Sequence, residues 1–404
     1  MSQAVYIVDG LRTPVGNFGG SLSAIRTDDL AAMVIKELTQ RNSSIPLSAY
    51  DDVILGCHNQ AGEDNRNVAR MASLLAGLPV TVPGETLNRL CASGMSAIVN
   101  GYRAIIAGDG DLFIAGGVEH MTRGPLVISK SSKAFGTDAK MEDSSFGWRF
   151  VNPKMKQMYG ADPMGITAEN LVEMYAISRE DQDKFALASQ LKAAKAEASG
   201  RLSKEIMPVE IPQRKGDSIL FKNDEFIRPN STLEALSKLR PAFKEGGTVT
   251  AGNASGLNDG AAAVILASKL AVDKYQLKPI AKIVTSAVVG VEPRIMGIGP
   301  VTATNKALAK AGLTLDDIDI FEFNEAFAAQ ALACTRNLGL ADDDKRINVN
   351  GGAIAIGHPL GMSGTRITYS AALELKYTGK KYALATMCIG VGMGYAIIIE
   401  NCTI

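Results

Sequence analysis

The chain has 404 residues with 42 basic and 42 acidic side chains, and 46% of its residues are hydrophobic while 21% are charged. This composition is typical of a globular protein with a large core, and it excludes a disordered or fibrous chain. Because Lys and Arg are not in excess, it also excludes nucleic-acid binding that depends on a basic surface, so we expect no nucleic acid as a partner.

The chain carries charged residues close to its first apolar segment and continues with a series of short apolar segments. Asp9 and Arg12 come before a hydrophobic signal segment could form, so we expect a cytoplasmic protein without a signal peptide. Segments rich in β-branched residues predict buried strands, which begin at Ala4, Asp52, Asp111, Ile280, Asp317 and Ala383. Stretches with helical spacing lie between them and begin at Asp28, Thr302 and Gly364.

Buried strands that alternate with helices predict an α/β fold with mixed, largely parallel sheets between helices. The order of strands, glycine-rich turns and helices occurs twice, which predicts a duplicated domain. We therefore expect a first half formed by residues 1–121 and completed by 248–275. A loop domain formed by 122–247 is inserted into it, and 276–404 form the second half.

An uncharged stretch near the C-terminus, residues 382–399, has the length of a membrane span. However, Gly390, Gly392 and Gly394 recur at every second position, and a helix with that glycine content would be weak. The stretch therefore predicts two buried strands joined by a glycine-rich turn, and we expect no contact with a membrane.

Cysteines and histidines are few, and none of them forms a C-x-x-C pair. They are Cys57, Cys91, Cys334, Cys388, Cys402, His58, His120 and His358. This spacing predicts neither a disulfide framework nor a metal site. Cys91 lies where an apolar segment meets a helix, in LNRLCASGMSA, and a helix N-terminus stabilises a thiolate. The sequence thus predicts an ionised nucleophile, although a buried, inert cysteine fits the position equally well.

Two further candidates lie in glycine-rich turns. His358, in NGGAIAIGHPLGMSG, is surrounded by glycines, and Pro359 prevents a helix from running through it. A histidine in such a turn suits a general base or an oxyanion donor. Cys388 ends an apolar strand in ATMCIGVGMG, where backbone N–H groups could stabilise an oxyanion. Too few residues follow these glycines for a dinucleotide-binding fold.

Asn324 and Glu325 come directly after a predicted strand, in FEFNEAFAAQA. Polar groups at the carboxyl end of a strand are typical of ligand sites in α/β sheets. The alternative is that Asn324 caps the helix that follows. His120, in GGVEHM, is expected to lie in the core.

Five segments together resemble the thiolase family, and the resemblance extends over essentially the whole chain. They are LCASGMSA, VTAGNASGLNDGAAA, FNEAFAAQA, GGAIAIGHPLGMSG and MCIGVGMG. The resemblance implies a thiolase-like fold of two similar halves with an inserted loop domain that binds coenzyme A (CoA). It also implies a homotetramer, a dimer of dimers, that uses CoA as co-substrate and holds no permanently bound cofactor.

The resemblance also implies a role for each candidate residue. Cys91 would be acylated, His358 would activate it and donate to one oxyanion hole, and Cys388 would move a proton at the acyl α-carbon. Asn324 would hold a water in that hole, while the backbone N–H groups of Cys91 and Gly390 would form a second hole. The implied CoA contacts are Met164, Arg228, Ala251, Ser255, Met296 and Ala326; at a further contact that is often Ser, this chain has Ala235.

The expected substrate is 3-oxoadipyl-CoA, cleaved by CoA to succinyl-CoA and acetyl-CoA. Thiolases specific for acetoacetyl-CoA usually carry His-Met where this chain has Pro163 and Met164. The segments AGEDNRNVARMASLLAGLP, FGWRFVNPKMKQMYG and RPNSTLEALSKLRP instead resemble thiolases that act on 3-oxoadipyl-CoA. The terminal carboxylate of that substrate requires a cation, for which Arg149 and Lys154 are the candidates.

There are three alternatives to this function. The first is an acetyl-CoA acetyltransferase that acts on acetoacetyl-CoA. The second is a condensing ketoacyl synthase, which would be expected to use Cys with two histidines or with His and Asn. In this chain, Cys388 stands where the second histidine would be expected. The third is a non-catalytic acyl-CoA or lipid carrier, which would be expected to lack the nucleophile that Cys91 supplies.

Overall fold

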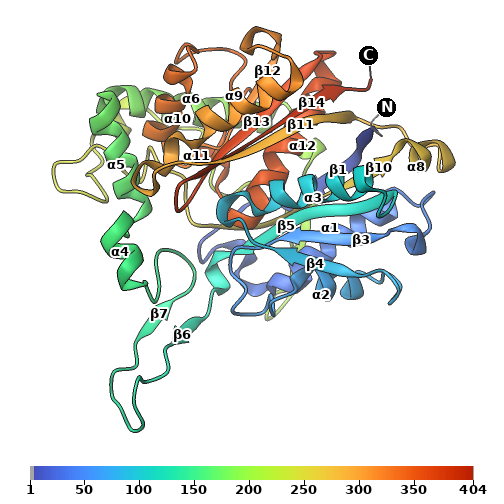
Figure 1. Ribbon diagram of the computed structural model, residues 1–404, viewed down its shortest axis with the longest axis horizontal. Helices are drawn as coiled ribbons and strands as arrows, with labels where there is room; N and C mark the ends of the chain where they lie inside the picture. Colours follow the sequence, from blue (N-terminus) through green and yellow to red (C-terminus); the bar gives the residue numbers. More distant parts are fainter. Residues whose placement is uncertain (1–3, 404) are drawn as a thin grey trace.

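The computed structural model describes residues 4–403, and the six predicted strands are present in it (Figure 1). They are β1 (Val5–Arg12), β3 (Asp52–Gly56), β5 (Leu112–His120), β11 (Ala281–Gly290), β12 (Ile320–Phe323) and β13 (Tyr382–Ile389). The three predicted helices are α1 (Thr27–Arg41), α9 (Gly299–Ala311) and α12 (Leu360–Thr378). Strand β14 (Met393–Asn401) follows β13 after a tight turn, so the uncharged stretch is a pair of strands as predicted.

No helix within residues 4–403 is long and apolar enough to cross a membrane. One long strand was not predicted, namely β10 (Asn258–Ser268), all of whose residues are buried. Its sequence, NDGAAAVILAS, begins with Asn and Asp and continues with Gly and Ala, all of which have low strand propensity. It shows no alternation because both of its faces are buried.

The main sheet has the strand order β12-β13-β14-β11-β1-β10-β5-β3-β4, where β4 is Gly84–Leu87. This order is nearly symmetric about the boundary between β1 and β11. In the first half β10 lies between β1 and β5, and in the second half β14 lies between β11 and β13. The duplication predicted from the order of elements is therefore present in the sheet.

Most strands within each half of the sheet run in the same direction. In each half all strands run the same way except one, which is β10 in the first half and β14 in the second. The predicted mixed, largely parallel arrangement of strands is therefore confirmed. Because each reversed strand lies inside its half, parallel ladders within residues 4–403 are confined to β3–β4, β3–β5 and β12–β13.

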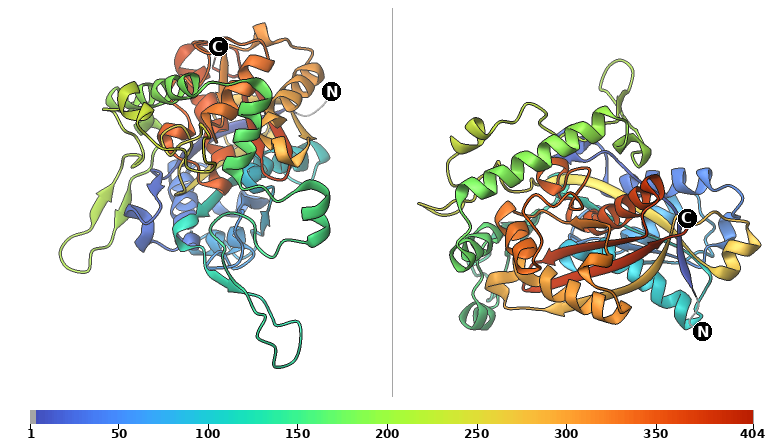
Figure 2. Two further views of the ribbon diagram at one scale, coloured as in Figure 1. Left: turned by 90° about the vertical axis from the view of Figure 1, so that its left-hand side faces the viewer. Right: turned by 90° about the horizontal axis from the view of Figure 1, so that it is seen from above.

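The helices form layers on both faces of this sheet (Figures 1 and 2). α3 (Ser93–Ala107) and α12 pack against each other and against strands of both halves, so they form the central layer. α1 and α2 (Val68–Leu75) cover the outer face of the first half, and α9 covers that of the second together with α10 (Ala328–Asn337). α3 and α12 each end at a glycine with left-handed φ, Gly108 and Gly379, a further sign of duplication.

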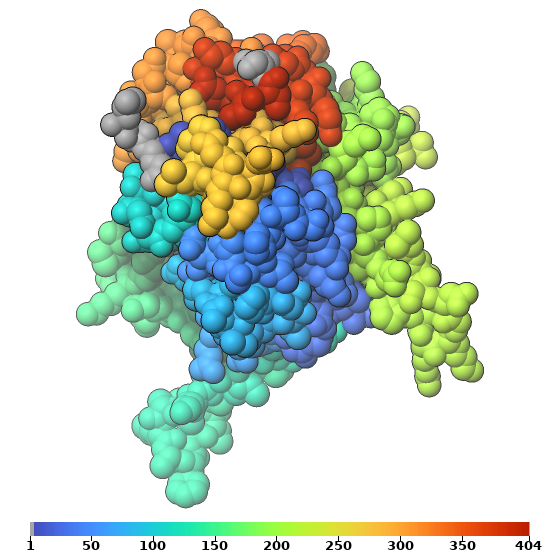
Figure 3. All heavy atoms as spheres, turned by 90° about the vertical axis from the view of Figure 1, so that its right-hand side faces the viewer, coloured from blue at the N-terminus to red at the C-terminus, as the bar shows by residue number. Residues whose placement is uncertain are grey.

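The segment between the two halves forms α4 (Pro153–Tyr159), α5 (Met164–Tyr175) and α6 (Arg179–Ala198), which lie along one side of the molecule (Figure 2). α5 and α6 both contact α10. Two hairpins project from the body (Figure 3), one formed by β6 (Leu126–Ile128) and β7 (Met141–Asp143) and the other by β8 (Val209–Ile211) and β9 (Ile219–Phe221). The exact boundaries of the three predicted domains remain a prediction.

Candidate active site

Cys91 lies in a short turn that leads directly into α3. Leu90 adopts a positive φ of 48°, which is uncommon for a residue with a branched side chain. Side chains hold this turn: Asn88 Oδ1 accepts the Leu90 N–H at 2.8 Å, and Ser93 Oγ donates to the Leu90 carbonyl at 2.7 Å. The turn contacts both α12 and β13, so it brings Cys91 to the second half of the molecule.

The expected ionisation of Cys91 is wrong. Burial raises the pKa of its thiol to about 11, although the N–H groups of Gly390 and of Cys91 itself act in the opposite direction. The charge of Glu119 raises the pKa further. The helix N-terminus therefore does not overcome desolvation, and the resting side chain is a neutral thiol that needs a base.

The neutral Cys91 thiol is expected to react with iodoacetamide at a rate that depends strongly on pH. Because the thiolate is the reactive form, we expect alkylation of Cys91 to accelerate continuously from about pH 7 to about pH 10. Peptide mass spectrometry measures the rate at Cys91 beside that at the buried Cys57, which is the control. A rate that is already constant above about pH 7 would contradict the neutral resting thiol.

His358 lies just before α12, in a turn that glycines allow to approach β5 closely. A Cβ atom at Gly361 would lie only 2.3 Å from the Val118 carbonyl, so the first turn of α12 requires glycine there. The His358 N–H donates to Asn258 Oδ1 at 2.9 Å, and Asn258 Nδ2 in turn donates to the Gly16 carbonyl at 3.0 Å. The position of His358 is thus fixed by strand β10.

Hydrogen bonds also assign the tautomer of His358. Ser363 Oγ donates its proton to the Pro359 carbonyl at 2.8 Å, so it accepts from His358 Nδ1, which lies 2.6 Å away. This leaves Nε2 unprotonated and able to take up a proton. Burial and the charge of Arg366 lower the pKa of His358 to about 3, so the imidazole is neutral.

Asn324 follows β12, and its side chain lies beside His358. Its Nδ2 lies 3.3 Å from His358 Nε2, and its backbone N–H donates to the Thr386 carbonyl in β13 at 3.0 Å. Asn324 Oδ1 is buried without a hydrogen-bond partner within residues 4–403. The alternative that Asn324 caps a helix is wrong, because α10 begins at Ala328 and has Phe327 at its N-cap.

Glu325 points away from this group and has a structural role. Its carboxylate accepts hydrogen bonds from Ser189 Oγ at 2.6 Å and from Asn348 Nδ2 at 2.6 Å. It therefore fixes α6 and the chain around Asn348 to the end of β12.

Cys388 lies near the end of β13 and is buried within a small apolar cluster. The cluster includes three of the residues expected to contact CoA, namely Met296 and Ala326, which are buried, and Met164, which packs against them. Burial raises the pKa of the Cys388 thiol well above its usual value, and the charge of Cys91 acts in the same direction. The two thiols are therefore close enough to affect each other electrostatically.

Gly390 connects these groups. A Cβ atom there would lie 3.4 Å from Leu90 Cδ1 and 3.7 Å from Met164 Sδ, and the Gly390 N–H stabilises the Cys91 thiolate. Of the five residues expected to catalyse the reaction, the structure places Cys91 with Cys388 and Gly390, and it pairs Asn324 with His358. Cys91 and His358 precede α3 and α12, whose first turns are in contact, since a Cβ atom at Gly94 would lie 2.5 Å from the Gly361 carbonyl.

The other expected CoA contacts lie at the rim of this group or outside it. Ser255 is half-buried and donates to the Ala326 carbonyl through both its N–H, at 3.0 Å, and its Oγ, at 3.1 Å. Ala251 and Arg228 are exposed, and the Arg228 guanidinium lies over the Phe226 ring at 5.7 Å. Ala235 is exposed in a short helix.

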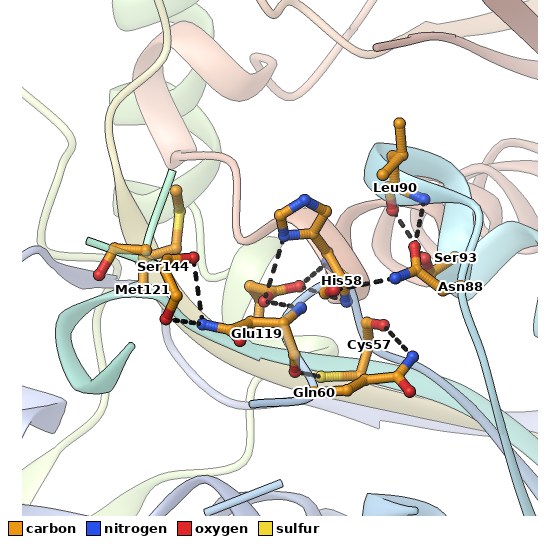
Figure 4. A network of polar contacts seen from close by, with 12 residues as sticks. Cys57, His58, Gln60, Asn88, Leu90, Ser93, Glu119, Met121 and Ser144 are labelled. Carbon is orange, nitrogen blue, oxygen red and sulfur yellow. Dashed lines mark hydrogen bonds and ion pairs between the residues drawn. The ribbon is translucent and has the colours of Figure 1, made fainter. Parts of the chain in front are cut away.

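Sequence reasoning missed Glu119, a fully buried carboxylate at the end of β5 (Figure 4). Its Oε2 accepts the N–H groups of His58 and Gly361, and its Oε1 accepts that of Asn59, each at 2.9 Å. Burial raises its pKa to about 7, while the three N–H groups lower it. Glu119 thereby joins the loop after β3 to the first turn of α12. The signal in the sequence is an acidic residue within an otherwise apolar strand, DLFIAGGVEH.

His120, the neighbour of Glu119, points to the other face of β5 and is buried, as expected for a core residue. Its Nε2 lies 3.1 Å from the Leu22 carbonyl, and its Nδ1 lies 3.3 Å from Asp259 Oδ1. No role in the site follows from this position.

Comparisons with known proteins agree with this arrangement. The thiolase N-terminal domain matches residues 5–270, and the thiolase C-terminal domain matches residues 277–401. The β-ketoadipyl-CoA thiolase of Acinetobacter baylyi is 59% identical over 98% of this chain and 99% of its own length. That of Pseudomonas aeruginosa is 58% identical over 99% of this chain and 100% of its own length. The crystal structure of human mitochondrial 3-ketoacyl-CoA thiolase in complex with CoA is 42% identical, with a TM-score of 0.91 over 99% of this chain and 98% of that chain. This chain therefore belongs to the thiolase family.

Proposed function

We propose that this thiolase cleaves 3-oxoadipyl-CoA with CoA to give succinyl-CoA and acetyl-CoA. The observation that carries the proposal is the placement of Cys91 and His358 just before the contacting first turns of α3 and α12, with Cys388 near Cys91 and Asn324 beside His358. The names of the relatives from Acinetobacter baylyi and Pseudomonas aeruginosa support the choice of substrate.

The neutral Cys91 thiol is activated during the reaction rather than before it. As Sγ attacks the C3 carbonyl of the substrate, its proton passes to Nε2 of His358, the ring nitrogen that the tautomer leaves free. The oxyanion that develops on C3 receives the N–H groups of Cys91 and Gly390. Breaking the bond between C2 and C3 then leaves a succinyl group on Cys91 and releases acetyl-CoA as its enolate.

Cys388 completes this half of the reaction by donating a proton to C2 of the enolate. The enolate oxygen is stabilised by protonated His358 and by a water held by Asn324, whose buried Oδ1 lacks a partner within residues 4–403. In the second half, the thiol of CoA attacks the succinyl thioester and its proton passes to Cys388. Protonated His358 returns its proton to Sγ, so Cys91 leaves as a thiol. CoA acts throughout as a substrate, not as a resident cofactor.

The pantetheine arm of CoA is expected to pass between Met164, Met296 and Ala326, which lie around Cys388. Ser255 lies next to Ala326 and would follow along the arm, while the exposed Ala251 and Arg228 would lie nearer the nucleotide. This order extends from the buried thiols to the surface, as expected for a long, narrow substrate.

The comparison of two substrates tests the proposal. We expect kcat/KM for 3-oxoadipyl-CoA to exceed that for acetoacetyl-CoA by about tenfold or more, because the additional carboxylate supplies binding energy in the transition state. A preference for acetoacetyl-CoA would contradict the proposed substrate and favour the acetyltransferase alternative. A lack of turnover with either substrate would favour the non-catalytic carrier.

Assembly as a homotetramer in the cytoplasm is part of the proposal. The hairpin β6–β7 projects from the body and exposes large apolar side chains (Figure 3). They are Leu126, Ile128, Phe135 and Met141. Apolar side chains on a projecting arm are typical of a surface that contacts another subunit, and this supports a tetramer.

A further inference from the structure

His58 lies next to the nucleophile, although the catalytic scheme does not use it. It is the second residue after β3, and its N–H donates to Glu119 Oε2 at 2.9 Å. Its carbonyl accepts from Asn88 Nδ2 at 2.9 Å, and the same Asn88 side chain accepts the N–H of Leu90. Two hydrogen bonds therefore connect His58 to the residue that precedes Cys91 (Figure 4).

No hydrogen bond within residues 4–403 holds the imidazole ring of His58 in its position. Its side chain is 16% exposed, and Nδ1 is buried without a hydrogen-bond partner within residues 4–403, since the nearest carboxylate oxygen, Glu119 Oε1, is 4.0 Å away. Buried polar atoms usually have partners, so a free one beside an active site suggests that a ligand supplies the partner.

Arg149 is connected to the residue that follows His58 through a shared hydrogen-bond acceptor. Its Nη1 donates to the Ser144 carbonyl at 3.2 Å, and that carbonyl also accepts from Asn59 Nδ2 at 3.2 Å. Asn59 directly follows His58 in the chain. Within residues 4–403 no carboxylate lies within ion-pair distance of Arg149, whereas the buried Arg12 is paired with both Glu205 and Asp224. Arg149 is half-buried and so keeps an uncompensated positive charge near the site.

We infer that Arg149 and His58 bind the terminal carboxylate of the acyl chain, so that together they select dicarboxylic 3-oxoacyl-CoA substrates. The inference rests on the proposed function, because the succinyl group that Cys91 would carry ends in this carboxylate. A guanidinium suits a carboxylate because it offers two parallel N–H donors, and an imidazole N–H adds a third.

The charges around His58 are consistent with this assignment. Burial, followed by the charge of Arg149, lowers the pKa of His58 to about 4, so the free enzyme holds a neutral imidazole. The charge of Glu119 is already met by three backbone N–H groups, so it competes little for Arg149. A bound carboxylate would compensate Arg149 and would favour protonation of His58. Lys154, the other cation considered, is exposed on α4 and has no contact with this group.

A matched pair of substrates tests the inference. 3-Oxoadipyl-CoA and 3-oxohexanoyl-CoA have the same chain length and differ only in the terminal group, a carboxylate or a methyl. We expect Arg149→Gln to lower kcat/KM for 3-oxoadipyl-CoA by about tenfold to hundredfold and to leave that for 3-oxohexanoyl-CoA nearly unchanged. Arg149→Lys should retain part of the preference for 3-oxoadipyl-CoA over 3-oxohexanoyl-CoA. His58→Phe should reduce this preference by a smaller factor than Arg149→Gln does.

Lys154→Gln is the matched control, since it removes an exposed positive charge on α4 that has no contact with Arg149 or His58. It should leave the ratio of the two kcat/KM values as in the wild-type protein. If wild-type protein prefers 3-oxoadipyl-CoA and Arg149→Gln keeps that preference, the inference is overturned while the proposed function stands. If wild-type protein shows no preference for the dicarboxylic substrate, the proposed function itself fails. Equal losses with both substrates would show a structural role for Arg149 and would also overturn the inference.

Discussion

Replacing His358 with Ala is expected to lower the rate at which Cys91 is acylated by about 10²- to 10⁴-fold, the contribution typical of a general base. The reason is the neutral resting thiol: burial raises the pKa of Cys91 to about 11, so attack requires a proton acceptor at the site. His358 Nε2 is that acceptor because Nδ1 is protonated and bonded to Ser363. Rapid-mixing measurement of acyl-enzyme formation from acetyl-CoA gives the rate directly.

The control for this variant is Ser363→Ala, which removes the partner of Nδ1 but leaves the imidazole in place. It should slow acylation less than His358→Ala does, because the tautomer is no longer fixed while the base remains. An acylation rate of His358→Ala equal to that of the wild-type protein would show that another group accepts the proton. Thermal unfolding of both variants shows whether the fold is retained.

Replacing Cys388 with Ala is expected to separate the two halves of the reaction. Exchange of the α-protons of acetyl-CoA with solvent should fall by about 10²- to 10⁴-fold, because the group that moves this proton is lost. Acylation of Cys91 by acetyl-CoA should continue at a reduced rate, because the imidazole and the oxyanion donors remain while the group that protonates the departing CoA is lost. Proton NMR in deuterated water measures the exchange, and intact-protein mass spectrometry measures the acylation.

Cys334→Ala is a matched control for this experiment. Cys334 is also a fully buried thiol near Cys388, but its Sγ donates to the Gly297 carbonyl at 3.1 Å. The Cys334→Ala variant should exchange the α-protons of acetyl-CoA at the wild-type rate. Normal exchange in Cys388→Ala would remove Cys388 from the mechanism, and loss of both activities together with a lowered melting temperature would mean that its role is structural.

The fold could be predicted where burial and pattern agree. The strands β1, β3 and β13 are continuous apolar segments bounded by turns, and they lie where the sequence indicates. Strand β10 was missed because small residues allow it to pack between β1 and β5, and that position in the sheet is a long-range property. The reversed direction of β10 and β14 likewise follows from pairing rather than from local sequence.

The site shows the same division between local and long-range information. Glycine-rich turns indicated His358 and Gly390, and the resemblance to the thiolase family supplied their roles. The ionisation of Cys91 could not be predicted, because desolvation depends on the chain that covers the turn. Glu119 and His58 were not recognised as members of the site, since their importance comes from partners in other segments, such as Gly361 in α12.

The near-symmetric order of the strands has a consequence for how such a site arises. Cys91 stands just before α3 and His358 just before α12, and these two helices occupy equivalent places in the central layer. An ancestor with identical halves would have brought the same residue to both positions, so it would have lacked a nucleophile and base of different kinds. Unequal chemistry at the two positions requires that they can change independently, and fusion of the halves into one polypeptide makes that possible.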